Sequence, residues 1–441
     1  MSDTQKTFKN FLKKKTPTLE FYDASAMFIV QYILQFMLQF IFMVVAYILI
    51  ADMLKVETST QDGLEAVTNK FSLFTASTAG IIIITLINEA TMILSPLAYW
   101  KVKSFNVFEG IGFKRKVNGG QIAMTLPIAC LLLAGFMPVA NLFVTLVYKT
   151  GYEYTGANIV VDSFGKLVLF LIVTAALPAV CEEILHRGMI ARAGSKISFI
   201  AGLLLSSTIF AFMHGSPIQL VHQFFVGVVC ALVYFMTGSI WIPVLVHFFN
   251  NAITLTASYV NFVVNDGATT ISIPWWLLLI MCIVGIGGLA GCLYAMYVIS
   301  YRKRKKEDLA AESATENVES DALNIAAPDN IANYETAPSA QDSDTSSEVV
   351  YVDKRKKRPI KVFQEKLAYL FTSPEQIKMQ KEEQAKLDEQ LAEYSPEKRE
   401  VFYSMQNDDK VEIKKKNSRG IIFALVIVFV IWLFNTIGGY L

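Results

Sequence analysis

Apolar residues form nine long runs separated by shorter polar segments. The runs cover roughly 24–51, 75–100, 121–148, 166–190, 197–214, 218–236, 240–262, 272–300 and 420–440. A helix of about 20 apolar residues crosses the ~30 Å hydrocarbon core of a bilayer. The pattern therefore predicts an all-α fold: a polytopic transmembrane helix bundle of about eight spans, then a long and largely disordered polar segment, and a final ninth span.

These runs divide the chain into four parts. We expect an N-terminal segment at 1–23, a transmembrane core at 24–300, a polar segment with short helices at 301–419 and a C-terminal transmembrane helix at 420–441. Of the 77 charged residues, 46 lie between Tyr301 and Arg419. The formal net charge is only +1, which excludes a generally basic nucleic-acid binder. The expected surroundings of the core are therefore a lipid bilayer and not a nucleic acid.

Lysine and arginine are concentrated in alternate loops. They precede the first apolar run and follow the second, fourth and eighth runs, whereas the other loops carry mainly acidic residues such as Glu57, Asp62 and Glu153. Basic loops stay on the cytoplasmic side of a membrane. We therefore expect the N-terminus and the segment 301–419 to be cytoplasmic.

The polar segment contains two different patterns. Residues 307–350 are rich in Ala, Ser, Asp, Glu, Asn and Thr, a composition typical of disorder. The stretch KRKKRPIKVFQEKLAYLF at 354–371 then repeats apolar residues at helical spacing. It predicts a basic amphipathic helix, either on the anionic inner leaflet or simply solvated. The segment 301–419 is also where we expect a protein partner to bind, if the chain has one.

The five cysteines are best interpreted as buried small hydrophobic residues. None forms a CxxC or other close pair, so neither a disulfide framework nor a thiolate metal site is expected. All five lie inside apolar runs: Cys130, Cys181, Cys230, Cys282 and Cys292.

Ionisable residues are concentrated in one apolar region. All four histidines lie within 62 residues, and two adjacent glutamates precede the first of them: Glu182, Glu183, His186, His214, His222 and His247. Ionisable groups at membrane depth are costly and usually functional. A catalytic or binding cluster is therefore the favoured interpretation, with a structural polar network as the alternative.

Helical spacing gives the two glutamates different neighbours. Residues four apart share a helix face, so Glu183 is expected to pair with Arg187, while Glu182 has His186 as its own neighbour. His247 and Asn251 form another such pair. His214 ends its apolar run and lies nominally deeper than the others, unless the helix tilts or ends early at the turn around Gly215.

At this point the chain resembles a known family. CEEILHRG is similar to the EExxxR motif, FAFMH to the FxxxH motif and HFFNN to the HxxxN motif of the CPBP intramembrane proteases. This family is also called Abi or CAAX-protease-like and includes the type II CAAX prenyl endopeptidases. The resemblance covers roughly 120–260, and residues 222–252 look like bacterial members, which implies a bacterial plasma membrane.

The resemblance implies specific roles. Glu182 and His214 would activate a water, His247 and Asn251 would stabilise the oxyanion, and Arg187 would fix the helix through Glu183. The family is often described as metalloproteases, and a glutamate with two histidines would suit zinc with an open position. The absence of HExxH and the presence of Asn251 favour a metal-free mechanism, so no cofactor is certain and a divalent metal stays the alternative.

Other polar residues leave alternatives open. Glu89 is expected either to pair with Arg187 or line a substrate groove, or, with Asn88, to make a simple interhelical hydrogen bond. His186 either tunes Glu182 or is merely tolerated, and His222 is expected to pack or to face a loop.

The predicted function is an intramembrane endopeptidase that cleaves membrane-anchored proteins or peptides. The first alternative is a non-proteolytic scaffold or immunity protein of the same fold, which the intact motifs disfavour. The second is a transporter with a proton relay, which would favour two similar halves with broken helices; no such symmetry is present.

Overall fold

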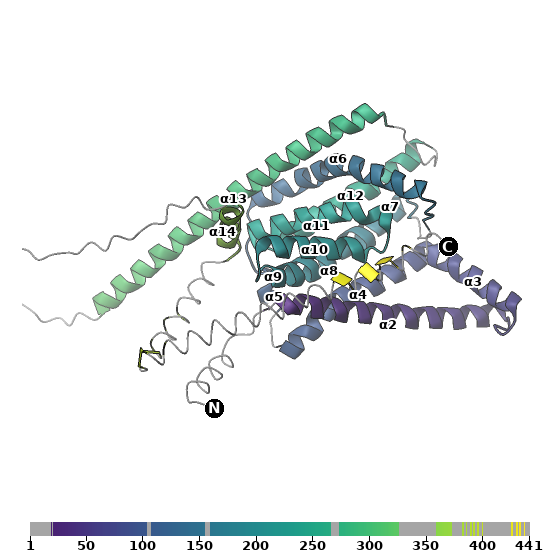
Figure 1. The fold of residues 1–441 in the computed structure, drawn as a ribbon, viewed down its shortest axis with the longest axis horizontal. Coiled ribbons are helices and arrows are strands. Elements are labelled where there is room, and N and C mark those ends of the chain that lie inside the picture. Colours follow the sequence, from purple (N-terminus) through teal and green to yellow (C-terminus); the bar gives the residue numbers. More distant parts are fainter. Residues whose placement is uncertain are drawn as a thin grey trace, which may run out of the picture.

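The computed structural model describes residues 19, 21–103, 107–154, 159–265, 273–325 and 359–372, together with single residues between 382 and 436. All regular elements in these residues are helical, and no strand occurs among them. The predicted all-α fold is therefore confirmed. The helices form a bundle from which one long helix projects (Figure 1).

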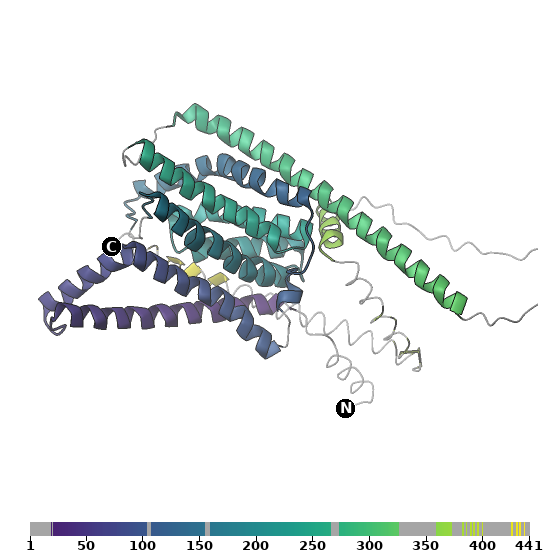
Figure 2. The same cartoon turned by 180° about the vertical axis from the view of Figure 1, so that it is seen from behind.

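The first three helices form a layer along one edge of the bundle (Figures 1 and 2). They are α2 (Phe21–Leu54), α3 (Gln61–Ala76) and α4 (Thr78–Lys103). Glutamines on α2 bind α4: Gln39 donates to the Asn88 side chain at 2.8 Å and Gln35 donates to it at 3.3 Å. Asn88 therefore makes the interhelical hydrogen bonds that the alternative interpretation expected.

Two long helices pack closely on the opposite side of the bundle. They are α6 (Gly119–Lys149), which a capping box at Asn118 and Gln121 starts, and α13 (Trp275–Ile325). At their crossing Gly135 and Gly285 meet backbone to backbone, and a Cβ atom on either would clash. Small residues at such a crossing let two membrane helices approach closely.

The helix that carries the glutamates is not a uniform α-helix. It is built from α7 (Phe164–Phe170), the π-helix η1 (Leu171–Ala176), α8 (Leu177–Glu183), the π-helix η2 (Ile184–Ala191) and α9 (Arg192–Gly194). Short π-helical segments are rare and are frequently found at functional sites. The two glutamates lie at the junction of α8 and η2.

Three further helices complete the core. They are α10 (Phe199–Met213), α11 (Pro217–Thr237) and α12 (Trp241–Val264). The turn between α11 and α12 requires a glycine, because Gly238 ends α11 with φ of 65° in the left-handed region. The loop before α6 is hydrogen-bonded to this end of the bundle. Trp241 Nε1 donates to the Phe113 carbonyl at 3.0 Å, and Tyr234 Oη donates to the Ile111 carbonyl at 3.2 Å. A short helix, α5 (Val107–Gly110), precedes that loop.

In the part of the chain that the structure describes, six helices are long and apolar enough to cross a membrane. They cover Asp23–Leu54, Thr78–Val102, Gly119–Lys149, Phe164–Gly194, Pro217–Thr237 and Trp275–Ala310. The expected run 197–214 forms the shorter apolar helix α10, of 15 residues. The run 240–262 forms α12, which has polar residues along its middle and is not one of the six. The chain is an integral membrane protein.

The expected boundary at residue 300 is wrong, because α13 continues as one helix to Ile325. Its second half carries charge pairs at helical spacing, such as Arg304 Nη2 with Asp308 Oδ1 at 3.3 Å, and pairs of this kind stabilise a solvated helix. Disorder expected at 307–325 is therefore replaced by helix, and most of 326–358 lies outside the described residues. The expected ninth span also lies mostly outside them, and its described residues, Leu425 and Trp432 among them, are helical.

The predicted amphipathic helix is α14 (Pro359–Phe371), and it packs against the protein. Leu367 and Leu370 are buried, and Phe371 packs against Phe199, Tyr234 and Phe235. The part of its apolar face from Leu367 to Phe371 is therefore covered by the bundle, whereas Phe363 is exposed. At its other side Tyr369 Oη donates to Asp308 at 2.6 Å, and burial, with this hydrogen bond, raises the pKa of Tyr369 to about 12.

Candidate active site

A buried ion pair lies at the start of η2. Arg187 Nη1 donates to Glu183 Oε1 at 2.6 Å, and both side chains are completely buried. The second Arg187 amino group donates to the Gly227 carbonyl of α11 at 3.2 Å. The pairing predicted from the spacing is therefore present, and it neutralises two charges that would be costly alone.

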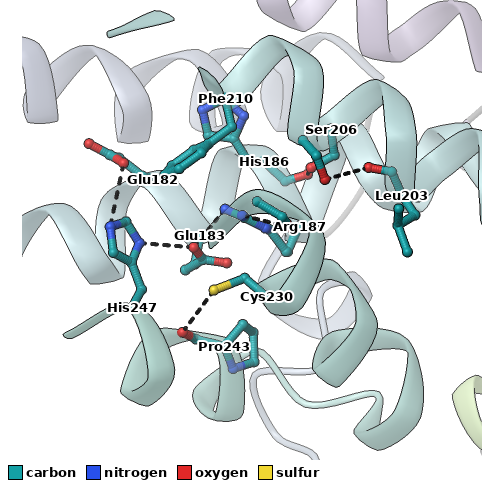
Figure 3. A network of polar contacts seen from close by, with 12 residues as sticks. Glu182, Glu183, His186, Arg187, Leu203, Ser206, Phe210, Cys230, Pro243 and His247 are labelled. Carbon is teal, nitrogen blue, oxygen red and sulfur yellow. Dashed lines mark hydrogen bonds and ion pairs between the residues drawn. The ribbon is translucent and has the colours of Figure 1, made fainter. Parts of the chain in front are cut away.

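His247 of α12 connects the two glutamates (Figure 3). Its Nδ1 lies 3.0 Å from Glu183 Oε1, and its Nε2 lies 3.9 Å from Glu182 Oε2. Because the ionised Glu183 carboxylate only accepts hydrogen bonds, Nδ1 carries the proton of this contact. Nε2 is then the nitrogen that faces Glu182.

Glu182 differs from its neighbour in its contacts and its exposure. Glu183 Oε1 binds both Arg187 and His247, whereas Glu182 Oε2 has no hydrogen-bond partner within the described part of the chain, and its gap to His247 Nε2 is too long for a direct bond. Glu183 Oε2 is also buried without a partner, but the Glu183 side chain is completely buried, whereas 14% of the Glu182 side chain is exposed. Of the two adjacent glutamates, Glu182 is thus the one that is not paired with arginine and the more accessible one.

Phe210 of α10 is the centre around which three histidines gather. Its ring makes edge contacts with His186, His214 and His247, at centroid distances of 5.1, 5.0 and 5.5 Å. The Arg187 guanidinium lies over the same ring, 4.6 Å from its centroid. The phenylalanine of the FxxxH motif therefore positions side chains from α10, η2 and α12, a role that its sequence spacing indicated only for His214.

The depth mismatch expected for His214 is resolved by an early helix end. Helix α10 ends at Met213, and Gly215 follows with φ of 66°. His214 Nδ1 lies 2.9 Å from the Phe210 carbonyl oxygen, which keeps its ring against that of Phe210. Since Nδ1 donates to this carbonyl, His214 Nε2 is the nitrogen available to another group.

The expected pairing of His186 with Glu182 is not what the described contacts show. The His186 ring packs edge-on against Phe210, and its backbone carbonyl accepts from Ser206 Oγ at 3.0 Å. The π-helix η2 begins between the two residues, so the four-residue spacing of an α-helix no longer places them on one face.

Two asparagines follow His247 on α12, and only one was predicted. Asn250 Nδ2 donates to Asn251 Oδ1 at 3.1 Å, which leaves the amide N–H groups of Asn251 as donors. Asn250 is buried and lies beside His222 of α11. Neither the asparagine pair nor the neighbourhood of His222 follows from motif spacing, because both depend on how α11 and α12 pack.

Glu89 of α4 reaches the same region from the first layer. Glu89 lies near Cys181 of α8, and it is near enough to Glu182 for their charges to interact. Arg187 instead binds Glu183, Gly227 and the Phe210 ring. The expected pairing of Glu89 with Arg187 is thus replaced by a contact with Cys181.

A metal centre does not fit this arrangement. Among the described residues, no group of three or more His, Cys, Asp or Glu side chains is placed to hold a metal ion. His247 Nδ1 and Glu183 are committed to each other and to Arg187. We therefore derive no step through zinc or another divalent metal.

The buried carboxylates and histidines of this site lie on apolar helices of a membrane protein. Residues 164–253 match the family model described as type II CAAX prenyl endopeptidase Rce1-like. No curated protein and no solved structure matches the chain. This match supports a CAAX-protease-like domain at 164–253, and the matched range includes all six predicted site residues. The general activity that it supports is that of an intramembrane endopeptidase.

Proposed function

We propose that this protein hydrolyses peptide bonds of membrane-associated proteins or peptides, with Glu182 as the general base. The observation that carries the proposal is the contrast between two adjacent glutamates. Glu183 is completely buried and paired with Arg187 and His247, whereas Glu182 has no arginine partner, is 14% exposed and lies 3.9 Å from His247 Nε2. A base needs a carboxylate that is not held in an ion pair and that a water can reach.

In the proposed reaction, Glu182 removes a proton from a water as the water oxygen bonds to the scissile carbonyl carbon. The tetrahedral intermediate carries the negative charge on the former carbonyl oxygen. Glu182 then returns the proton to the leaving amine nitrogen as the C–N bond breaks. His214 is proposed to orient the water through Nε2, the nitrogen that its contact with the Phe210 carbonyl leaves available.

The proposed oxyanion donors are His247 and Asn251, one helical turn apart on α12. Asn251 has free N–H groups because its oxygen accepts from Asn250. His247 donates through Nε2 only when the imidazole is protonated, since Nδ1 already donates to Glu183. Donors aimed at a developing oxyanion each contribute on the order of 10²-fold to the rate.

The proposed substrates are peptides or proteins anchored in the same membrane, such as leader peptides, bacteriocin precursors or anchored regulators. This choice rests on the location of the site among apolar helices of an integral membrane protein. A prenylated substrate is not required by any contact of the site.

The test compares new protein N-termini in membranes from cells that carry wild type or Glu182→Gln at matched expression. Glutamine keeps the size and polarity of the side chain and removes the base. We expect a set of cleavage products to disappear, by on the order of 10²-fold or more, which would also identify the substrate.

The matched control is Glu153→Gln, the same chemical change at an exposed position. It should leave all N-termini unchanged. If Glu182→Gln also leaves them unchanged while rescuing a deletion phenotype, proteolysis fails as the function, and a scaffold of the same fold takes its place.

A further inference from the structure

Helix α14 lies outside the matched range 164–253, yet its last turn packs where several elements of the proposed site converge. It lies beside α13 at the end of the bundle (Figure 1). The Phe371 ring makes edge contacts with three other rings, at centroid distances of 5.7, 5.3 and 5.4 Å: Phe199, Tyr234 and Phe235. The Arg192 guanidinium lies 5.3 Å from the centroid of the Phe371 ring. One side chain of α14 therefore contacts α9, α10 and α11 together.

Those three elements hold groups on which the proposed reaction depends. Helix α9 continues η2, and Arg192 follows Arg187 by five residues. Helix α10 carries Phe210 and has His214 as its C-cap, and α11 provides the Gly227 carbonyl that binds Arg187. A shift of α9 relative to α10 or α11 would therefore change the distance between the glutamates and the histidines.

A second connection to η2 runs through the loop that precedes α6. Arg115 donates to the Leu370 and Phe371 carbonyls at 2.8 and 2.7 Å, so this loop holds the last turn of α14. Ile111 of the same loop is fully buried and packs on Gly188 of η2, where a Cβ atom would lie 2.8 Å from the Ile111 side chain. The loop therefore joins α14 to η2 at the residue that follows the buried ion pair.

The helix supported in this way is irregular. Backbone geometry as rare as the π-helix of η2 persists where surrounding contacts hold it in place. Ile111 supports η2 at Gly188, and Phe371 supports the residue directly after its end, Arg192. A displacement of about 1 Å in a reacting group can lower a rate on the order of 10²-fold, so a contact that fixes η2 affects the reaction without touching it.

We propose that Phe371 is a positioning residue of the proposed protease, and that its ring, with Arg115 holding the end of α14, fixes η2 and α9 against α10 and α11. This inference rests on the proposed function of Glu182. Phe371 acts through the elements that it contacts and not through a reacting group. Cleavage then requires α14 to be attached to the bundle, and an event that detaches α14 switches the protease off.

The kinetic test uses the full chain in detergent and a peptide spanning a cleavage site found in the N-terminus comparison. Phe371→Ala should lower kcat by about tenfold or more with KM unchanged. Phe371→Leu keeps most of the packed volume and should return kcat to within about threefold of wild type. The matched control is Phe363→Ala, the same change on the same helix at a side chain that is 40% exposed, and it should leave kcat unchanged.

Hydrogen exchange separates a positioning role from a general loss of stability. In Phe371→Ala the backbone amides of η2 and α9, at 184–194, should exchange faster by about fivefold or more, whereas those of α6 should keep the wild-type rate. The value of kcat is then expressed per folded molecule. Faster exchange throughout the chain would overturn the proposal, because Phe371 would then serve the stability of the whole bundle.

A second variant covers the case in which Phe371→Ala fails to fold. Arg115→Ala loosens the end of α14 without removing the Phe371 ring, and kcat should fall by about threefold or more. Full kcat in either variant would overturn the proposal, and so would a raised kcat, because α14 would then block the site. If Glu182→Gln keeps full cleavage, the proposed function fails; if Glu182→Gln abolishes cleavage and Phe371→Ala does not reduce it, this inference alone is lost.

Discussion

Glu182 and Glu183 are adjacent in the chain, but their side chains contact different residues. Glu183 is ion-paired with Arg187 and completely buried, whereas Glu182 has no arginine partner and is 14% exposed. Helical spacing alone predicted the pair of Glu183 with Arg187. It did not predict that His247 lies against both glutamates, because that contact joins residues 64 positions apart and depends on tertiary packing.

The buried ion pair leads to a stability prediction. Arg187→Met should lower the free energy of unfolding by about 3–5 kcal/mol, since it leaves the Glu183 charge buried without its partner. Unfolding in detergent with increasing denaturant measures this loss. The double variant Glu183→Gln with Arg187→Met should be more stable than Arg187→Met alone; an equally unstable double variant would show that packing, and not charge, sets the cost.

The Phe210 ring leads to a prediction on activity. Phe210→Leu should reduce cleavage on the order of tenfold or more, because three histidines lose the ring that fixes their orientation. Levels of the cleavage products identified above provide the measurement. Phe212→Leu is the matched control on the same helix: Phe212 packs against Trp432 instead, and equal losses in the two variants would contradict the positioning role.

At the scale of elements, the apolar pattern predicted where helices form better than it predicted what each helix packs against. The apolar face of α14 was visible in the spacing of Leu367, Leu370 and Phe371, but spacing cannot tell a lipid surface from a protein surface. The apolar pattern did not predict the π-helical segments η1 and η2, because they continue the helix and do not interrupt its apolar run. That is why the four-residue spacing of His186 from Glu182 is not accompanied by a contact between their side chains among the described residues.

The attachment of α14 depends on an arginine from a distant loop. Arg115 donates to the Phe371 and Leu370 carbonyls at 2.7 and 2.8 Å, which satisfies the end of the helix. Arg115→Ala should therefore increase hydrogen exchange of the backbone amides at 359–371 by about fivefold or more. Lys101→Ala, an exposed basic residue on α4, is the control. Unchanged exchange in Arg115→Ala would mean that apolar contacts alone hold α14.

For the whole molecule, the order of apolar runs was enough to predict the class of fold and its membrane character. The positions that mattered for the site, such as Glu89 next to Cys181, depend on how α4 packs against α8. No local pattern encodes that packing, and Glu89 was therefore predicted as a polar residue of interest without its partner.

The orientation of the whole helix bundle in the membrane is a prediction. Basic residues from separate loops meet at one end of the bundle: Arg115 binds the end of α14, and Arg192 lies over the Phe371 ring. With this end in the cytoplasm, a membrane-impermeant thiol reagent applied to intact cells should label Asp62→Cys and not Lys305→Cys. The wild-type cysteines give the background, and the reverse labelling would invert the topology.

The length of α13 has a consequence for whatever approaches the protein from that end. A helix of 51 residues extends about 77 Å at 1.5 Å per residue, more than twice the ~30 Å hydrocarbon core. Its charged half therefore extends beyond the hydrocarbon core as a stiff helix. Helix α14 is attached near the start of this half by the hydrogen bond from Tyr369 to Asp308. The distance between the apolar half of α13 and its end at Ile325 is therefore set by a rigid rod and not by a random coil.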